Sequence, residues 1–340
     1  MRRREALVSL MLLAAAPAWA APSPFAPGEW ETWAARFVQP DGRVVDTGNG
    51  GVSHSEGQGY GMLLAHAAGD RPVFDLIWQW AERNLAVRGD GLFAWRWNPA
   101  TPASPVADRN SASDGDLLIA WALTRAGGEW ADARHLERAR VLARVLRQKL
   151  VVAHGADTLL LPGPSGFTRP EGPVVNLSYW VFPALRALAA VDPDPAWAAL
   201  EGTGLRLLGT ARFGRFALPA DWALLADPPR PAPGFPATFG YNAIRIPLHL
   251  VWARIEDPWL LAPFRALWRH EGDTPPVVVD LEPPGRVEPA RNRGALAIAR
   301  LTLAEPGSQP VLPGLGNETD YYAASLTMLA KLALLESRRL

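Results

Sequence analysis

Residues 112–130 of the chain read ASDGDLLIAWALTRAGGEW, a run that opens with two acidic residues and continues as an apolar stretch. Its apolar residues recur with helical spacing, which predicts a helix over residues 114–126. The same periodicity dominates the rest of the chain and indicates about eleven helices in all. The other helices are predicted near residues 28–38, 57–69, 72–86, 135–150, 174–190, 195–209, 240–254, 259–270, 291–303 and 325–335.

Signals for other kinds of structure are few. Short strands are predicted only at residues 158–161 and 277–279. The connections are rich in proline and glycine, and irregular loops are expected at residues 98–105, 162–173, 227–236 and 275–289. No connection is long and polar enough to separate independent domains, and no fixed-length repeat recurs. The sequence therefore predicts a single all-α domain with long loops.

The first twenty residues carry the features of an export signal. Arginines at positions 2–4 precede an apolar run at residues 7–16, and Ala18-Trp19-Ala20 gives a small-x-small cleavage pattern. The apolar run is shorter than the roughly 18 residues that a membrane-spanning helix needs. We expect a signal peptide over residues 1–20 and one exported domain over residues 21–340, periplasmic or secreted. An uncleaved membrane anchor is the alternative.

The composition excludes several classes of protein. The chain has no cysteine, so disulfides, thiolate nucleophiles and cysteine-ligated zinc are excluded. Removing residues 1–20 leaves 31 basic and 33 acidic residues of the original 34 and 34, and this balance gives no sign of a nucleic-acid or membrane partner. The six histidines are scattered, and neither a metal nor a cofactor is expected. The 15 tryptophans suit both core packing and stacking on sugar rings.

Two of the predicted helices begin with carboxylates. Residues 55–58 (Ser-Glu-Gly-Gln) and 113–116 (Ser-Asp-Gly-Asp) both have the pattern of a capping box, with serine at the cap and a polar side chain three residues later. Acidic residues in the first turn are also stabilised by the helix macrodipole. Each site alone therefore has a purely structural explanation.

Three features favour a catalytic role for Glu56 and Asp114. Glycines flank both residues, and they weaken a helix unless another segment must approach closely. Aromatic and amide side chains crowd the same stretches. Paired carboxylates are also what cleavage of a glycosidic bond requires, one as acid and one on the opposite side. A helix start lowers a carboxyl pKa whereas a general acid needs a raised one, so we predict that Glu56 and Asp114 approach each other across a cleft.

Two long motifs resemble family 8 of the glycoside hydrolases. Residues 112–123 (ASDGDLLIAWAL), continued by Ala126 and Trp130, are similar to the family signature. Residues 55–62 (SEGQGYGM) are similar to the stretch around its proton donor. Residues 41–46 (DGRVVD) and 241–245 (YNAIR) resemble the periplasmic endoglucanases of this family that accompany bacterial cellulose synthase. The likeness runs through most of the mature chain.

The resemblance implies an (α/α)6 barrel of about twelve helices. It implies an endo-β-1,4-glucanase that hydrolyses cellulose with inversion, with Glu56 as proton donor and Asp114 distorting the sugar and positioning water. It further implies trimming of nascent cellulose, with the cellulose synthase and export machinery as a partner. The alternatives are a catalytically weak, glucan-binding component of the export complex, or a hydrolase of chitosan or xylan.

The chain departs from the family pattern at Asn242. Many relatives carry an aspartate there as the general base, and an amide cannot accept a proton at neutral pH. Another loop would then supply the base, and Asp221 is the first candidate, with Asp227 and Asp320 less favoured. The alternative is that Asn242 only positions water and that the activity is weak.

Aromatic side chains are the predicted sugar platforms, at Trp95, Trp97, Tyr179, Trp180, Trp222 and Tyr241. Trp95 and Trp97 alternate in a loop-like segment and form the preferred pair, although core packing explains any single aromatic equally well. Asn110 is a further candidate for contact with substrate. Arg245 follows Tyr241 by one helical turn and is expected to hold a carboxylate or a sugar hydroxyl, with a buried ion pair as the alternative.

Overall fold

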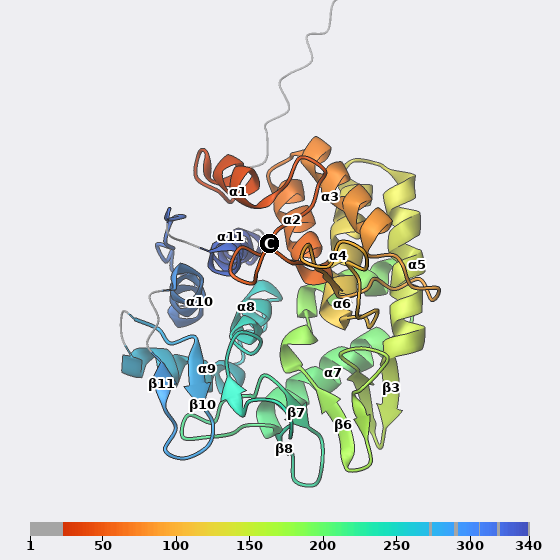
Figure 1. Cartoon of the computed structure of the whole chain (residues 1–340). Helices are drawn as coiled ribbons and strands as arrows, with labels where there is room; N and C mark the ends of the chain where they lie inside the picture. The colour runs from red at the N-terminus through yellow and green to blue at the C-terminus, as the bar shows by residue number, and fades with distance from the viewer. Residues whose placement is uncertain (1–22, 272–273, 289–291, 306, 318–319, 339–340) are drawn as a thin grey trace, which may run out of the picture.

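A computed structural model describes residues 23–271, 274–288, 292–305, 307–317 and 320–338, and the expected signal peptide lies outside this part. Within these residues the chain forms eleven α-helices (Figure 1). They are α1 (Glu29–Phe37), α2 (Ser55–Ala67), α3 (Arg71–Asn84), α4 (Ser113–Glu129), α5 (Ala133–Leu150), α6 (Phe182–Val191), α7 (Pro195–Thr210), α8 (Arg245–Trp252), α9 (Pro258–Glu271), α10 (Arg293–Leu303) and α11 (Tyr321–Glu336). A 3-10 turn, η1 (Leu177–Tyr179), precedes α6. No helix of the described part is both long and apolar enough to span a membrane.

The helices pack as an (α/α)6 barrel, as the sequence predicts. Contacts between helices run in a closed circuit from α2 through α4, α6, α8, α10 and α11 back to α2. The remaining helices, α1, α3, α5, α7 and α9, pack against the outside of this circuit. Helices α2, α4, α8 and α11 are buried along most of their length, whereas α5 buries only one stripe of residues. Two concentric layers require this difference, because an inner helix contacts neighbours on several sides.

Most predicted helices are confirmed within a few residues of their expected ends. Residues 174–190 are an exception, because α6 begins only at Phe182 and the preceding valines belong to strand β6 (Gly172–Val175). These β-branched residues pair with strand β7 (Ala223–Leu224). The prediction for residues 240–254 is also wrong in part, since residues 240–244 form a turn and α8 begins at Arg245.

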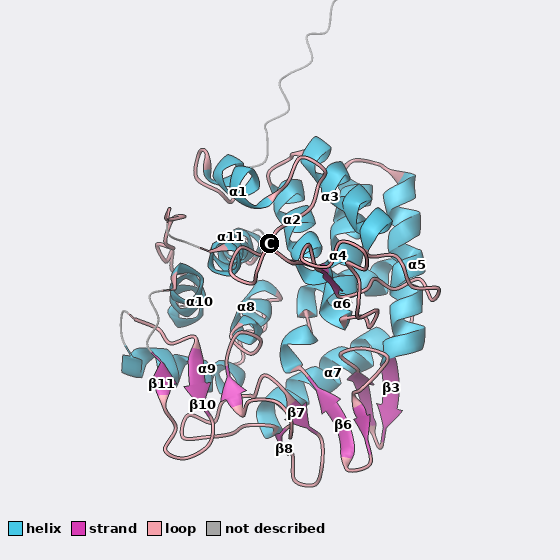
Figure 2. Ribbon diagram, viewed as in Figure 1, coloured by secondary structure: helices cyan, strands magenta, loops and turns pink. Residues whose placement is uncertain are grey.

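Short antiparallel strands are more numerous than the sequence predicts. Besides β6 and β7 they are β1 (Ser53–His54), β2 (Arg96–Trp97), β3 (Val151–His154), β4 (Asp157–Leu160), β5 (Thr168–Arg169), β8 (Arg230–Pro231), β9 (Thr238–Phe239), β10 (Val278–Asp280) and β11 (Val287–Glu288). The sheets have the orders β1-β2, β3-β4, β5-β6-β7-β8 and β11-β10-β9. Figure 2 shows most of these strands at one end of the barrel.

The two predicted strands correspond to β4 and β10, and both are confirmed within a residue. The loops predicted over residues 162–173, 227–236 and 275–289 are wrong in part, because besides the predicted β10 they contain β5, β8 and β11 and the start of β6. Proline is compatible with the ends and edges of such short strands, so the proline-rich composition concealed them. Residues 289 and 291, which end one predicted loop and begin one predicted helix, lie outside the described part.

Candidate active site

The helices α2 and α4 begin with the two predicted carboxylates. Helix α2 starts at Ser55 and α4 at Ser113, so Glu56 and Asp114 each occupy a first helical turn. The hydroxyls of both serines are buried without a hydrogen-bond partner in the described part of the chain, and neither helix has a side-chain cap. The predicted capping boxes are therefore wrong at both helix starts.

Gln58 shows why the first capping box does not form. Its side-chain oxygen accepts a hydrogen bond from the N–H of Val44 at 2.7 Å. Its amide nitrogen donates to the carbonyls of Gly42 at 3.2 Å and Ile77 at 3.1 Å. Buried backbone groups need such partners, and here they take the side chain away from its own helix start.

Asp116 plays the corresponding part in α4. It is fully buried and accepts hydrogen bonds from the N–H of Phe93 at 2.9 Å and from the hydroxyl of Ser111. Burial raises the pKa of Asp116 to about 7. Because Trp95 follows Phe93 by two residues, Asp116 also fixes the segment that carries a predicted sugar platform.

Glycines let α2 and α4 approach each other closely, as the sequence predicts. A Cβ atom on Gly115 would lie 2.7 Å from the backbone nitrogen of Glu56 and closer still to the hydroxyl of Ser55. A Cβ atom on Gly59 would lie 2.5 Å from the Cβ of Leu118. Larger residues at these positions would push the two helices apart, so the glycines hold the two carboxylates near each other.

Arg245 joins the two carboxylates. Its Nη1 contacts Glu56 Oε1 and donates to Asp114 Oδ2 at 3.0 Å. The hydroxyl of Tyr60 donates to the same oxygen of Glu56 at 3.0 Å and lies 3.2 Å from Nη1. The side chain of Arg245 is 3% exposed, whereas that of Glu56 is 21% exposed. One guanidinium nitrogen thus binds both carboxylates, which confirms the prediction that they approach each other.

Burial dominates the electrostatics of this cluster. It raises the pKa of Asp114 to about 7, and the nearby carboxylate of Asp116 acts in the same direction. It also lowers the pKa of Arg245 and raises the pKa of Tyr60 well above its usual range, so the phenol stays a neutral donor. The guanidinium beside Asp114 favours the charged carboxylate and opposes the effect of burial.

Asn242 is held by two hydrogen bonds to its side-chain oxygen. Arg245 Nη2 donates to this oxygen at 2.9 Å, and Asn176 Nδ2 donates to it at 3.0 Å. The same Nη2 donates to the hydroxyl of Ser178 at 3.0 Å. The amide is thus a fixed, neutral group beside the carboxylates.

Asp221, the first candidate for the base, is largely buried behind backbone donors. Its Oδ1 accepts hydrogen bonds from the backbone N–H groups of Gly240, Asn242 and Ala243 at 2.9, 3.2 and 2.7 Å. Burial raises the pKa of Asp221 to about 6. These bonds fix the turn that leads into α8, so the structure gives Asp221 a part in placing Asn242.

Two adjoining cavities share Glu56, Asn242 and Arg245 in their walls. The first, the Tyr241 cavity, is also lined by Asp46, Gly48, Asn49, Tyr241, Asp320 and Tyr322. The second, the Trp95 cavity, is also lined by His54, Ser55, Trp95, Ala112, Asp114, Tyr179 and Trp222. Glu56 thus lies where the two cavities meet. Asp221 and Asp227 line neither cavity.

Four predicted sugar platforms line the cavities. Trp95, Tyr179 and Trp222 lie in the Trp95 cavity, and Tyr241, 57% exposed, lies in the Tyr241 cavity. His54 stacks on Trp95 with ring centroids 5.9 Å apart. Aromatic side chains therefore line both cavities, although Trp222 is also stacked against Phe167 and Phe235, with ring centroids 5.6 and 4.6 Å away.

Three other predicted contacts line neither cavity. Trp97 packs edge-on against Trp80 with ring centroids 5.7 Å apart, and Trp180 is buried with its ring nitrogen donating to a carbonyl of α7. Asn110 donates to the carbonyl of Ser165 at 2.9 Å. Core and loop packing engage these side chains, and their contact with substrate stays a prediction.

Some residues of the cleft carried no clear signal in the sequence. Asp46 and Tyr322 line the Tyr241 cavity, His54 lines the Trp95 cavity, and Ser178 binds Arg245. Asp46 ends the segment 41–46 that resembles the family, which was the one available hint. Ser178 precedes Tyr179 and Trp180 in the sequence, and an isolated serine in this position gives no such hint.

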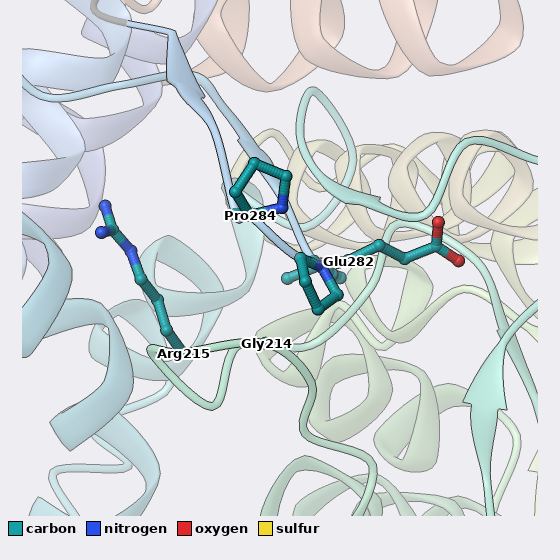
Figure 3. A pocket seen from close by; sticks show the side chains of 7 residues that line it. Gly214, Arg215, Glu282 and Pro284 are labelled. Atoms are coloured by element: carbon teal, nitrogen blue, oxygen red, sulfur yellow. The ribbon is translucent and has the colours of Figure 1, made fainter.

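A further hollow lies between the loop at Gly214 and the β10–β11 connection (Figure 3). Arg215, Glu282 and Pro284 contribute to its lining. In Figure 3 the side chains of Arg215 and Glu282 point away from each other, so these two charges do not converge on a ligand. This hollow shares no residue with the two cavities beside Glu56.

A helical barrel with a cleft that presents a glutamate beside a buried aspartate defines a class of enzyme, the glycoside hydrolases. The profile of the glycosyl hydrolases family 8 matches residues 1–335. The chain belongs to this family, as the two motifs at the helix starts predict.

Known proteins agree with this assignment. A probable endoglucanase from Novacetimonas hansenii is 39% identical over 336 residues, which cover 97% of each chain. An endoglucanase from Cellulomonas uda is 42% identical over 297 residues, 84% of this chain and 80% of the relative. A family 8 endoglucanase from Klebsiella pneumoniae superposes with a TM-score of 0.86 and 42% identity, over 91% of this chain and 99% of that one. An endo-β-1,4-glucanase from Acetobacter xylinum superposes with a TM-score of 0.84 and 40% identity, over 91% and 97%.

Proposed function

We propose that the protein is an endoglucanase that hydrolyses internal β-1,4 bonds of glucan and inverts the anomeric carbon. The observation that carries this proposal is the position of Glu56 between two cavities, because an internal bond needs room for sugars on both sides of the cut. The names of the relatives support β-1,4-glucan as the substrate. The aromatic side chains in both cavities suit flat sugar faces.

Glu56 is the general acid in this proposal. Tyr60 and Arg245 both bind its Oε1, and no donor from the described residues binds its Oε2. One oxygen therefore anchors the side chain while the other can carry the proton to the glycosidic oxygen. As the bond to the leaving sugar breaks, water attacks the anomeric carbon from the opposite face.

Asp114 holds the sugar at the point of cleavage. Its Oδ2 binds Arg245 and its Oδ1 accepts the N–H of Gly115 at 2.8 Å, so the carboxylate has a fixed orientation in the wall of the Trp95 cavity. Remaining lone pairs on both oxygens can accept hydrogen bonds from sugar hydroxyls or from water. Inversion requires no covalent intermediate, so Asp114 needs no nucleophilic role.

The test replaces Glu56 by glutamine. Loss of a general acid is expected to lower kcat on carboxymethylcellulose by on the order of 10²–10⁴-fold. Glu137→Gln changes an exposed glutamate and is the control, with kcat expected to stay at the wild-type level. Reducing-end assays measure the rates, and NMR of the first product gives its anomeric form.

Wild-type-like rates in the Glu56→Gln variant would contradict this role. A wild-type chain that binds cello-oligosaccharides but releases no product would favour a glucan-binding role instead. Chitosan and xylan assayed beside cellulose decide between related β-1,4 polysaccharides.

We further propose that the enzyme works outside the cytoplasm and trims cellulose during its synthesis and export. The motif at residues 1–20 and the resemblance of residues 41–46 support this proposal. Fractionation of cells for the protein, with the cellulose yield of a strain that lacks it, is the test. Retention in the cytoplasm or an unchanged yield would contradict the proposal.

A further inference from the structure

In the proposed reaction the attacking water must lose a proton, and the roles given to Glu56 and Asp114 do not include accepting it. Asn242 lines both cavities with Glu56, but its oxygen already accepts hydrogen bonds from Arg245 and Asn176. A neutral amide does not accept a proton at neutral pH. The base must therefore be another group in the wall of the cleft.

The carboxylates that line the two cavities are Glu56, Asp114, Asp46 and Asp320. Glu56 is the acid, and Asp114 has one oxygen bound by a guanidinium and the other by a backbone N–H. Asp320 is exposed and accepts a backbone N–H at the start of α11. Asp46 is the remaining carboxylate in the walls of the two cavities.

Asp46 is fixed on a tight loop. Its side chain is 15% exposed, and Oδ1 accepts the N–H of Gly48 at 3.0 Å. Its backbone pairs with Val52, and the N–H of Gly51 donates to its carbonyl at 3.0 Å. Oδ2 lies 3.8 Å from Nδ1 of His54, beyond hydrogen-bond distance. The loop thus holds the carboxylate in place without a close cationic partner in the described part.

The surroundings of Asp46 favour proton uptake. Burial raises the pKa of this carboxyl and outweighs the backbone N–H groups of Gly48 and Asn49 and the charge of Arg96, which lower it, while Asp320 acts in the same direction as burial. Burial, with Arg96 nearby, lowers the pKa of His54 to about 4, so its imidazole is neutral at neutral pH. A carboxylate with a raised pKa is a better proton acceptor than an ordinary one.

We propose that Asp46 is the general base of the reaction. Water beside Asn242 forms the new bond to the anomeric carbon and gives one proton to Asp46. The bond from that carbon to the leaving sugar breaks, and Glu56 gives its proton to the leaving oxygen. Asp46 ends protonated and Glu56 ionised, and proton exchange with solvent restores both.

The test uses the full-length enzyme with Asp46 replaced by asparagine, which keeps an acceptor for the N–H of Gly48. On cellopentaose, kcat is expected to fall by on the order of 10²–10⁴-fold while KM changes little. Azide, a nucleophile that needs no base, restores turnover and yields a glycosyl azide of inverted configuration. An aryl cellobioside with a good leaving group does not restore turnover, because the acid is intact.

Two further variants serve as controls. Asp41→Asn changes an exposed carboxylate of the same segment and leaves kcat at the wild-type level. Asp320→Asn keeps an oxygen for the cap of α11 and lowers kcat less than Asp46→Asn does. Asp46→Ala is measured as well, and azide rescue of either variant shows that its fold is intact.

The outcomes separate this inference from the activity on which it rests. An inactive wild type would overturn both. An active wild type with an Asp46→Asn variant that keeps more than about a tenth of kcat, where a lost base removes far more, would overturn only the assignment of Asp46. The same holds if azide has no effect on a folded variant, or if Asp320→Asn is the more damaging change.

Discussion

Arg245 is a buried cation at the centre of the cleft, and its partners limit which substitutions are informative. Desolvation of a guanidinium is unfavourable, and the contacts with Glu56 and Asp114 compensate for it. An alanine at either carboxylate would leave this charge poorly paired and would confuse loss of proton transfer with loss of structure. Glutamine at Glu56 keeps an oxygen that Arg245 and Tyr60 can bind, which makes it the cleaner change.

Asp116 makes the stability of the protein depend on pH. Burial raises its pKa to about 7, whereas an aspartate in an unfolded chain titrates at about 3.9. The folded state therefore binds this proton more tightly, and the stabilisation is present below pH about 4 and lost as the pH rises through about 7. Asp116→Asn is expected to reduce the fall in the free energy of unfolding between pH 5 and pH 8. Each pKa unit corresponds to about 1.4 kcal/mol.

Urea titrations at the two pH values measure this effect. Asp41→Asn changes an exposed aspartate. In this variant the free energy of unfolding should change between pH 5 and pH 8 as much as it does in the wild type. An Asp116→Asn variant whose stability falls with pH as steeply as the wild type does would show that Asp116 is already ionised at pH 5 in the folded protein.

The sequence could identify Glu56 and Asp114 as a pair, and Arg245 separately as a partner for a carboxylate or a sugar hydroxyl, because each lies in a motif with a recognisable pattern. It could not place Asp46, whose position in the cleft depends on a loop closed by its own backbone. Trp97 shows the opposite error, since its ring packs against Trp80 and the guanidinium of Arg43 lies over it, 4.9 Å from the ring centroid. Contacts between distant segments decided both cases.

At the scale of the helices, the contact between α2 and α4 has no spare room. Gly115→Ala would bring a methyl group against Ser55 and the backbone of Glu56. Such overpacking is expected to lower the free energy of unfolding by about 1–3 kcal/mol. It should also reduce activity, because the start of α2 carries Glu56. Chemical denaturation and reducing-end assays measure the two effects.

Gly128→Ala is the matched control, because it changes a glycine of the same helix with nothing within 4 Å of the added methyl. Alanine is a better helix former than glycine, so this variant should be as stable as the wild type or more stable by up to about 1 kcal/mol. Equal effects of the two substitutions would mean that helix propensity, and not close approach, explains the glycine at position 115.

The helices could be predicted because ten or more residues share one periodic pattern, as in α5. The strands are two to four residues long and have no such pattern. Strand β6 exists because its valines pair with β7, about fifty positions away in the chain, as the pairing of Val174 with Leu224 shows. Local sequence cannot report a partner that only the fold brings near.

At the scale of the whole molecule, α1 closes the outer layer of the barrel over the contact between α2 and α11, and it packs against both of these helices. Trp33 is completely buried in this closure, and its ring nitrogen donates to the hydroxyl of Ser325 at 3.2 Å. Trp33→Ala is expected to lower the free energy of unfolding by about 3–5 kcal/mol. Replacing the exposed Trp259 by alanine should lower the free energy of unfolding by less than about 1 kcal/mol.

Thermal and urea unfolding of both variants test this closure. The Trp33 ring also packs against Tyr321, whose hydroxyl lies 2.8 Å from where a Cβ atom on Gly57 would be. Activity should therefore fall with stability in Trp33→Ala. Equal stability of the two tryptophan variants would show that α1 is dispensable for the barrel.

The close fit of Gly115 against Ser55 also bears on how enzymes of this architecture can be recombined. The start of α2 leaves no room for a Cβ atom on Gly115, although about sixty positions separate Gly115 from Ser55 in the chain. A chimaera that takes residues 53–60 from one parent and residues 111–116 from another would combine a start of α2 and a start of α4 that are not matched to each other. The two segments therefore have to come from the same parent. Recombination that keeps each single helix whole would still disrupt this contact between two helices.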